Sequence, residues 1–374
     1  TPPLARLSES RSARQPISSV CISARPQKRQ WRTKSSVCSV RKSAKCDFFV
    51  NLMKKSLTFR LWVNDKVFKN PEEVINNVAL VCDFISEKIK ALHLESEKEV
   101  LHLNRTLSGD IFVKADGFYR LYDFVENSYS RDLPQNKEEF FESAVTFGEF
   151  QYLLSDFPVE KLSETIPDFH NTEKRYADFE KSVKADSFGR ANKAKEEISF
   201  AENKKYFSTL LKSSAEKFNI PLKVTHNDTK INNILFSKRT KKGLCVIDLD
   251  TVMPGYSVTD FGDSIRFGAS TALEDEKDLR KVHFDFELYK TYLKGFVKGT
   301  NGSLSQAEKL LLPLGAMVMT FECGIRFLAD YLSGDTYFKT DYPDHNLVRC
   351  RTQFKLLSEM EEKSDIMIEE AKKA

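Results

Sequence analysis

The chain has 374 residues, enough for a large hydrophobic core and about two domains or lobes. Its net charge of +4 is uneven, because residues 1–52 carry eleven Lys and Arg but only two acids. The remaining chain is acidic, which argues against a nucleic-acid-binding body. Seven cysteines without paired metal-ligand spacing favour a reducing compartment, and we expect a cytoplasmic protein.

Residues 1–52 form a basic leader rich in Ser and Arg. This composition is typical of disorder, of an organellar transit peptide, or of a miscalled start, and we favour the miscalled start. The chain begins with Thr, its first Met is Met53, and no glycine precedes Gly109. A glycine-rich phosphate-covering loop is therefore not recognisable in the first hundred residues.

Residues 53–127 have the pattern of a small mixed domain. Asn70 and Pro71 predict a helix start, and an apolar face extends from Val74 to Leu92. Strands are expected over residues 99–107, 110–114 and 118–125, with a turn at 107–110. The last strand leads into a connection to the rest of the chain.

Residues 136–216 are helical in pattern, beginning with apolar positions at i, i+3, i+4 and i+7 between Phe140 and Leu154. Further on, Ser305 and Glu308 form a capping box that opens a long helix toward Leu332, with Gly334 as its stop. The longest apolar run, residues 310–321, is too short to span a bilayer, so we expect no membrane partner.

Between these helical regions lies the stretch that carries the chemistry. Residues 224–236 and 244–250 are apolar runs separated by a turn of Ser, Lys, Arg and Gly, which predicts a β-hairpin. Strand pairing would bring Asp228 and Asn233 close to Asp248. Carboxylate and amide oxygens are suitable ligands for Mg²⁺. Side chains two residues apart on a strand lie on the same face, so Asp250 would share a face with Asp248.

The spacing also matches the kinase pattern, in which Asp is followed five positions later by Asn and a metal-binding Asp lies one hairpin further on. An isolated Asp and Asn at strand ends would be unremarkable. Here His226 precedes Asp228 by two residues, and apolar runs flank the motif on both sides. The combination favours a catalytic loop.

With residues 226–228, Asn233 and residues 247–248, the chain resembles the aminoglycoside phosphotransferase and choline kinase superfamily, a branch of the protein-kinase-like fold. Residues 248–255 and 260–266 are similar to those of the N-acetylhexosamine 1-kinases. The resemblance extends over residues 68–361. It implies an α+β fold of two lobes, with a partial N-lobe at 53–127 and a mainly helical C-lobe at 128–374.

The resemblance implies ATP and Mg²⁺ as cofactors and a small sugar as substrate. Asp228 would be the catalytic base and Lys230 a cation near the transferred phosphoryl group, unless it is only a solvated loop lysine. Asn233, Asp248 and Asp250 would hold the metal. His226 would have a structural role, and Asp263 would brace the catalytic loop. Asp260 or Asp263 as a second metal ligand is a less favoured alternative.

Adenine would meet the backbone of Phe124, Val125 and Glu126, although a core strand running into a loop would explain this segment equally well. The resemblance places Arg326, Tyr337 and Phe267 at the acceptor. Arg326 has a competing interpretation as an ordinary i, i+4 partner of Glu322.

Three functions remain open from the sequence. The first is phosphorylation of the anomeric hydroxyl of an N-acetylhexosamine. The second is transfer to another small hydroxyl compound of the aminoglycoside or choline type, which the cations Arg266 and Arg326 disfavour. The third is an inactive nucleotide-binding pseudokinase, because neither the glycine loop nor a strand lysine is recognisable.

Overall fold

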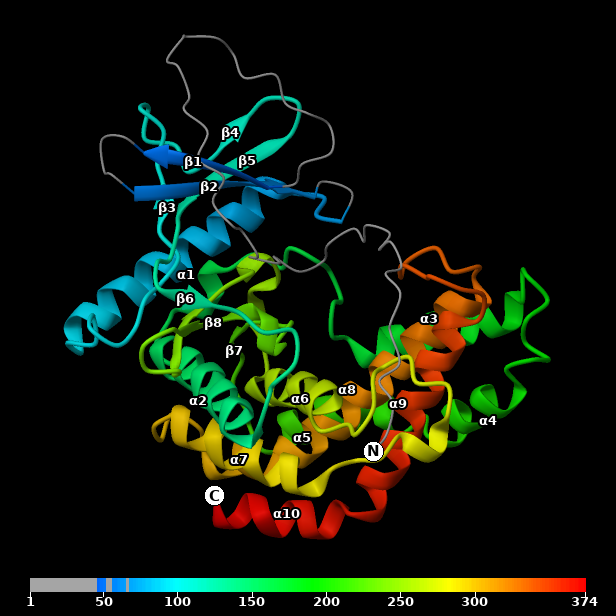
Figure 1. Cartoon of the computed structure of the whole chain (residues 1–374). Helices are drawn as coiled ribbons and strands as arrows, with labels where there is room; N and C mark the ends of the chain where they lie inside the picture. The colour runs from blue at the N-terminus through cyan, green and yellow to red at the C-terminus, as the bar shows by residue number, and fades with distance from the viewer. Residues whose placement is uncertain (1–45, 52–55, 65–66) are drawn as a thin grey trace, which may run out of the picture.

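The computed structural model describes residues 46–51, 56–64 and 67–374 (Figure 1). A small sheet with one long helix lies above a larger, mainly helical body. This confirms the predicted α+β, two-lobed, protein-kinase-like architecture. Most of the expected leader lies outside the described residues, but its residues Cys46–Asn51 form strand β1.

The N-lobe is an antiparallel sheet in the order β1-β2-β5-β3, and β4 also pairs with β5. Its central strands are β2 and β5, and β5 leads directly into the connection between the lobes. The remaining bounds are β2 Ser56–Val63, β3 Leu103–Asn104, β4 Val113–Lys114 and β5 Phe118–Asp123.

The predicted strands at 99–107 and 110–114 are wrong in length, since only two residues of each pair with β5. The segment bends instead into a turn, in which Thr106 N–H donates to the Asp110 carbonyl at 2.8 Å and Gly109 N–H donates to the Thr106 carbonyl at 3.0 Å. The turn expected at 107–110 is present.

Helix α1, Pro71–Ala91, starts at Asn70 with Pro at its first position, as predicted. Its buried face includes Val74, Val78 and Ile85. The side-chain amide of Asn77 reaches the other lobe, donating to the carbonyls of Ser163 at 2.8 Å and Val252 at 3.1 Å. This helix therefore ties the N-lobe to the region of the expected catalytic loop.

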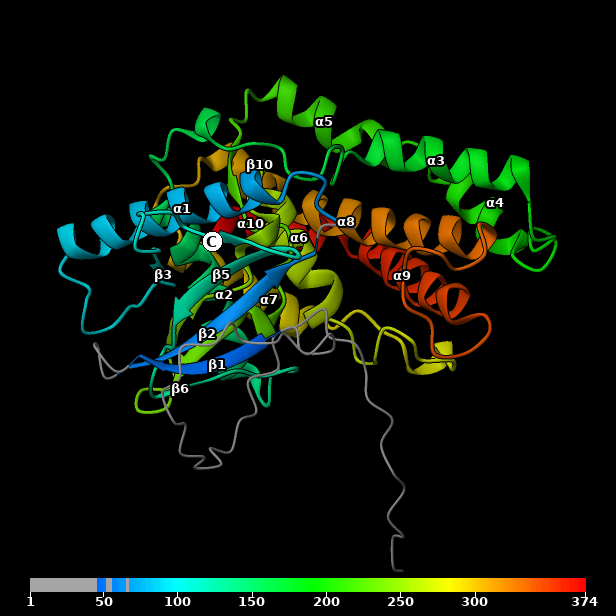
Figure 2. The same cartoon turned by 90° about the horizontal axis from the view of Figure 1, so that it is seen from above.

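The C-lobe is built around α8, Gln306–Leu332, which packs against α3, α6 and α9 (Figures 1 and 2). The capping box of Ser305 and Glu308 is formed, and Gly334 follows the helix end with φ +91°. The other helices are α2 Lys137–Leu153, α3 Thr172–Ala185, α4 Lys195–Asn203, α5 Phe207–Lys217, α6 Ser257–Gly268, α7 Phe286–Gly299, α9 His345–Glu362 and α10 Ser364–Lys373.

By length and composition α8 would suffice to cross a membrane, but 83% of its most apolar window is buried inside the protein. Close packing explains this burial. A Cβ added at Gly262 of α6 would lie 2.3 Å from the Gly315 carbonyl oxygen of α8, so the two helices meet backbone to backbone. Cys245 and Cys323 are free and buried.

The single long hairpin expected at 224–250 is only partly correct. Strand β8, Ile234–Ser237, pairs with β9, Gly243–Val246, and β6, Ser128–Tyr129, joins the other edge of β8. Residues 223–225 instead form β7, which pairs with β10, Met253–Gly255. Residues 226–233 are thereby released from strand pairing and form a loop between the two small sheets.

Candidate active site

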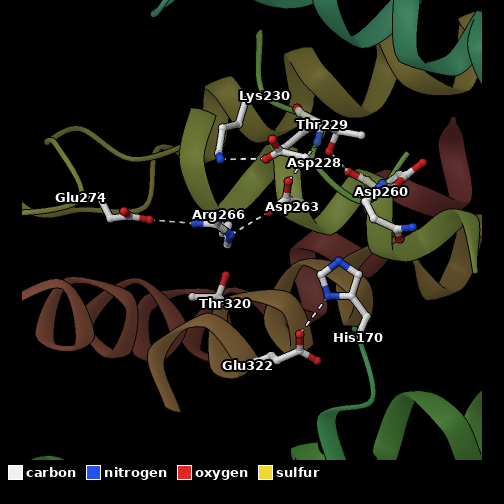
Figure 3. A network of polar contacts seen from close by, with 12 residues as sticks. His170, Asp228, Thr229, Lys230, Asp260, Asp263, Arg266, Glu274, Thr320 and Glu322 are labelled. Carbon is white, nitrogen blue, oxygen red and sulfur yellow. Dashed lines mark hydrogen bonds and ion pairs between the residues drawn. The ribbon is translucent and has the colours of Figure 1, made fainter. Parts of the chain in front are cut away.

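The loop of residues 226–233 is held from below by α6 (Figure 3). Asp260 accepts hydrogen bonds from the backbone N–H groups of His226 and Asn227, both at 2.8 Å, and from Gln151 Nε2 at 2.7 Å. Asp263 accepts from Thr229 N–H at 3.0 Å. Two buried carboxylates one helical turn apart therefore fix the backbone on both sides of Asp228.

Asp263 thus contacts the loop that it was predicted to brace, and Asp260 makes more of the contacts. Its carboxylate oxygens are occupied by loop donors, so the alternative of Asp260 as a metal ligand does not fit. Burial raises the pKa of Asp260, against the opposing effect of His226 and the loop N–H groups. The sequence signal for this residue was its i, i+3 spacing from Asp263 on one helix face.

His226 is fully buried and its Nε2 lies 2.9 Å from the Ile247 carbonyl oxygen. This contact joins the loop to the end of β9. Its ring also packs edge-on against Phe147 and Phe150 of α2. Packing and hydrogen bonding both place His226 behind the loop, and its structural role stays a prediction.

Asp228 points out of the loop and is held by two neighbours. Lys230 Nζ lies 2.7 Å from Asp228 Oδ1, and Asn233 Nδ2 donates to Asp228 Oδ2 at 3.1 Å. The Asp228 carboxylate raises the pKa of Lys230, with burial acting in the opposite direction. Lys230 is therefore an ion-pair partner of Asp228 and not only a solvated loop lysine.

Asp248 and Asp250 are arranged differently from the prediction. Asp248 has a left-handed backbone, with φ +60° and ψ +51°, and residues 249–251 form a 3-10 turn, so the two acids do not alternate along a strand. Asp250 instead forms a tight ion pair with Arg120 of β5. Asn233 remains beside Asp248, because its carbonyl accepts from Ile247 N–H at 2.9 Å.

The residues around Asp248 suit a divalent cation. Burial, Asp250 and Asp228 together raise the pKa of Asp248 to about 7, against the effects of Arg120 and Lys230. A hard cation would relieve this concentration of negative charge, and the Asn233 amide, whose nitrogen faces Asp228, offers its oxygen. No cluster of three His, Cys, Asp or Glu ligands occurs in the described chain, so phosphate oxygens or water would complete the coordination.

A cavity lies between the lobes, next to Asp248. Apolar side chains from β2, β5 and the C-lobe line most of it, and Phe124 and Val125 of the connection between the lobes are among them. Glu126 is exposed and outside this lining, and the Ser128 hydroxyl donates to the Val125 carbonyl at 2.7 Å. The lining residues are Phe59, Leu61, Leu101, Arg120, Tyr122, Phe124, Val125, Leu235, Ile247, Asp248 and Leu249.

Arg266 does not face the cleft, which corrects the expectation from the sequence. It is buried on α6, where its Nε donates to Asp263 and its Nη1 to Glu274, each at 2.8 Å. Burial would raise the pKa of Asp263, but Arg266 and Lys230 outweigh it and hold this pKa below its usual value. Arg266 thus stabilises the carboxylate that holds the loop.

Arg326 and Tyr337 lie together at a hollow beside α8. The guanidinium of Arg326 lies within 6 Å of the ring centres of Phe169, Tyr337 and Phe338, and Arg326 Nη1 is 3.9 Å from Glu322 Oε1. The contact with Glu322 is present, whereas binding of sugar hydroxyls by Arg326 stays a prediction. Phe267 is half-buried on α6 and, among the described residues, shares no ring contact with Tyr337.

Glu322 connects this hollow to the catalytic loop. Its carboxylate accepts from Thr172 Oγ1 at 2.6 Å and contacts His170 Nδ1 at 2.8 Å, and His170 lies between Glu322 and Asp263 (Figure 3). Burial would raise the pKa of Glu322, but His170 and Arg326 outweigh it and keep the pKa low. His170 precedes α3 and Thr172 is its first residue, and both are far from Glu322 in sequence, so periodicity could not have found them.

The model of the phosphotransferase enzyme family matches residues 93–292, more than half of the chain. The match extends from the N-lobe through the catalytic loop, the Asp248–Asp250 turn and α6. The chain belongs to the phosphotransferase enzyme family.

Solved structures share the fold of this phosphotransferase at low sequence identity. A microcompartment-associated aminopropanol kinase has 14% identity and a TM-score of 0.54, over 86% of this chain and 93% of that one. An aminoglycoside phosphotransferase from Alicyclobacillus acidocaldarius has 10% identity and a TM-score of 0.51, over 91% and 93%. The choline kinase from Cryptosporidium parvum has 14% identity and a TM-score of 0.51, over 89% and 91%.

Proposed function

We propose that this phosphotransferase transfers the γ-phosphoryl group of ATP to the anomeric hydroxyl of an N-acetylhexosamine such as N-acetylglucosamine or N-acetylgalactosamine. Phosphoryl transfer is supported by the arrangement of Asp228, Asn233 and Asp248, which lie together on one rigid loop and the turn beside it. The choice of acceptor is supported by the sequence resemblance and by the charge of the hollow at Arg326.

Asp228 orients the acceptor hydroxyl and takes its proton, since its carboxylate projects from a loop that Asp260 and Asp263 hold rigidly. Lys230 offsets negative charge on the transferred group. Asn233 and Asp248 would hold Mg²⁺, which would supply positive charge to neutralise the phosphates. Adenine occupies the apolar cavity between the lobes, beside Phe124 and Val125.

The hollow beside α8 favours a neutral acceptor over an aminoglycoside or choline. Arg175 and Arg326 both line it, and burial together with Arg326 lowers the pKa of Arg175, so two guanidinium groups are close. The acids of this hollow already have partners: Asp178 pairs with Lys174 at 2.6 Å. Asp330 accepts from the backbone N–H of Tyr337 at 2.8 Å and of Phe338 at 2.9 Å. A cationic acceptor would meet repulsion here.

The test is a phosphorus-NMR assay of the purified protein with Mg·ATP and a panel of N-acetylhexosamines, choline, aminopropanol and an aminoglycoside. We expect a phosphate on C1 of an N-acetylhexosamine, and no product with Asp228→Asn, which is isosteric but lacks the basic carboxylate. Phosphorylation of a cationic acceptor alone would overturn the sugar assignment. ADP binding without transfer to any acceptor would support the pseudokinase alternative.

A further inference from the structure

Arg120 is a buried cation whose hydrogen-bonding capacity is only partly used. Its side chain is 3% exposed, and its Nη2 forms the tight ion pair with Asp250. Its Nε and Nη1 are also buried, yet they have no hydrogen-bond partner within the described part of the chain. An unsatisfied buried donor of a charged group is costly, so these two nitrogens call for a ligand.

The position of Arg120 indicates the kind of ligand that would lie beside it. It lines the cavity between the lobes, where Asp248 is the one acid and Arg120 the one base among the lining residues. The apolar walls and the connection at Phe124 and Val125 occupy the rest of the lining. An anion carried by an otherwise apolar or aromatic molecule fits this distribution, and a nucleotide is such a molecule.

Within the described residues of strand β2, no lysine takes the place that a kinase strand lysine usually has. Protein kinases use a strand lysine paired with a glutamate of the N-lobe helix. Strand β2, which precedes α1, has Arg60 and no lysine, and the Arg60 guanidinium lies 5.0 Å from the ring centre of Tyr119. On α1 the residue close to Arg120 is Cys82, whose pKa burial raises to about 12 with Arg120 opposing.

We propose that Arg120 binds the nucleotide phosphates in this enzyme, using Nε and Nη1 for phosphate oxygens while Nη2 holds Asp250. The inference rests on the proposed function and deepens it by naming the phosphate-binding cation of the N-lobe. The carboxylate partner comes from the metal-binding turn of the C-lobe and not from helix α1.

The planar guanidinium makes this double role feasible. Arginine presents five N–H donors in a fixed fork, so one edge can hold a carboxylate while the other faces a second anion. A lysine has a single ammonium group on a flexible stem and would have to divide it between the two. Because Arg120 lies on β5 and Asp250 on the C-lobe, binding of phosphate would also favour one relative position of the lobes.

Calorimetric titration of the full chain with ADP and, separately, with adenosine tests the proposal in the presence of Mg²⁺. Adenosine shares the base and the ribose of ADP but has no phosphate. We expect Arg120→Gln to weaken ADP binding about tenfold to a hundredfold, as for loss of hydrogen bonds to a charged group. Adenosine affinity should stay within about twofold. Arg120→Lys should retain more ADP affinity than Arg120→Gln, because it keeps the charge.

Two matched variants separate this role from others. Arg60→Gln removes the other cation of the central strands and should leave ADP affinity unchanged; a loss there equal to that of Arg120→Gln would overturn the proposal. Asp250→Asn removes the partner of Arg120 but leaves its charge, and should weaken ADP binding less than Arg120→Gln does. A larger loss with Asp250→Asn would make Arg120 a positioning residue only.

The remaining outcomes are decisive as well. Equal loss of ADP and adenosine in both Arg120 variants, or no loss in either, would overturn the proposal, and thermal unfolding of the same samples shows whether the fold is retained. If Arg120→Gln does not fold, the test rests on Arg120→Lys. A lower ratio of ADP to adenosine affinity than in the wild type would support the proposal, and an unchanged ratio would overturn it. Failure of the wild-type chain to bind ADP would refute the proposed function itself, independently of Arg120.

Discussion

Lys230 Nζ lies 2.7 Å from Asp228 Oδ1, so the cation two residues beyond the proposed base is its ion-pair partner. Asn233 Nδ2 holds the other oxygen of the same carboxylate. The Asp228 side chain is therefore fixed from both sides before any reaction begins. Such preorganisation reduces the reorganisation needed at the moment of transfer.

Replacing Lys230 by Met should lower kcat by about a hundredfold to a thousandfold, as for removal of one charge-stabilising donor at a transition state. The substitution removes the charge but keeps an unbranched apolar stem. Steady-state kinetics with the accepted sugar measure the effect. Lys242→Met, in the exposed turn between β8 and β9, is the control; equal loss in both variants would contradict a role for Lys230.

Asp260→Asn should destabilise the protein by about 1–3 kcal/mol, because an amide nitrogen would have to face backbone N–H donors that now meet carboxylate oxygens. Activity should fall by more than the loss of folded protein would explain, because the loop that carries Asp228 loses its anchor. Urea unfolding and kinetics below the transition measure both effects. Asp278→Asn, at a half-buried acid that pairs with Arg280, is the control, and an unchanged kcat in Asp260→Asn would refute the anchoring role.

Gly315→Ala should be strongly destabilising, because the added Cβ would lie 2.2 Å from the Val258 carbonyl oxygen and push α6 away from α8. Gly324→Ala, on the same helix, meets the movable ring of Phe354 at 2.5 Å and should be milder. Alanine has a higher helix propensity than glycine, and this gain, on the order of 1 kcal/mol, would offset part of the cost of Gly324→Ala. Thermal unfolding compares them; a milder effect at Gly315 would show that the helices can separate freely.

The sequence was sufficient for the elements that local chemistry dictates. Pro71 after Asn70 predicted the start of α1, and Ser305 with Glu308 predicted the start of α8, because caps and first-turn residues act within a few positions. The division of residues 223–255 into two small sheets could not be read in this way. Pairing of β7 with β10 joins residues about thirty positions apart, and nothing local distinguishes it from one long hairpin.

The same distinction holds within the active site. The spacing of Asp228, Asn233 and Asp248 was visible, since one loop and one hairpin bring these residues together. The partners were not visible: Asp250 meets Arg120, 130 positions away, and Glu322 meets His170, 152 positions away. Side-chain pairing at such separations depends on how the lobes and helices pack.

Folding stability should depend on pH through Glu359. Burial raises the pKa of this carboxyl, but Lys355, the Phe284 N–H and His283 outweigh it and lower the pKa from 4.5 to about 2. The folded state therefore favours the charged form, so the stabilisation is complete above about pH 4.5 and is lost as the pH falls toward 2. The difference in urea midpoint between wild type and Glu359→Gln should narrow over this range; a constant difference would contradict the assignment.

Glu322→Gln should impair acceptor binding without impairing nucleotide binding. The carboxylate contacts His170 and Thr172 and lies close to Arg326, so its neutralisation loosens the wall of the acceptor hollow. We expect the KM for the sugar to rise about tenfold, equivalent to one charge-assisted hydrogen bond, and the KM for ATP to stay within about twofold.

Glu308→Gln is the matched control for this prediction. Glu308 is equally buried on α8, but it pairs with Lys223 at 2.7 Å and caps the start of the helix. Its neutralisation should lower the thermal unfolding temperature while leaving the sugar KM unchanged. If both variants raise the sugar KM equally, the effect of Glu322 is a general consequence of a weakened α8. If Glu322→Gln alone raises it, the carboxylate shapes the acceptor site through the side chains it holds.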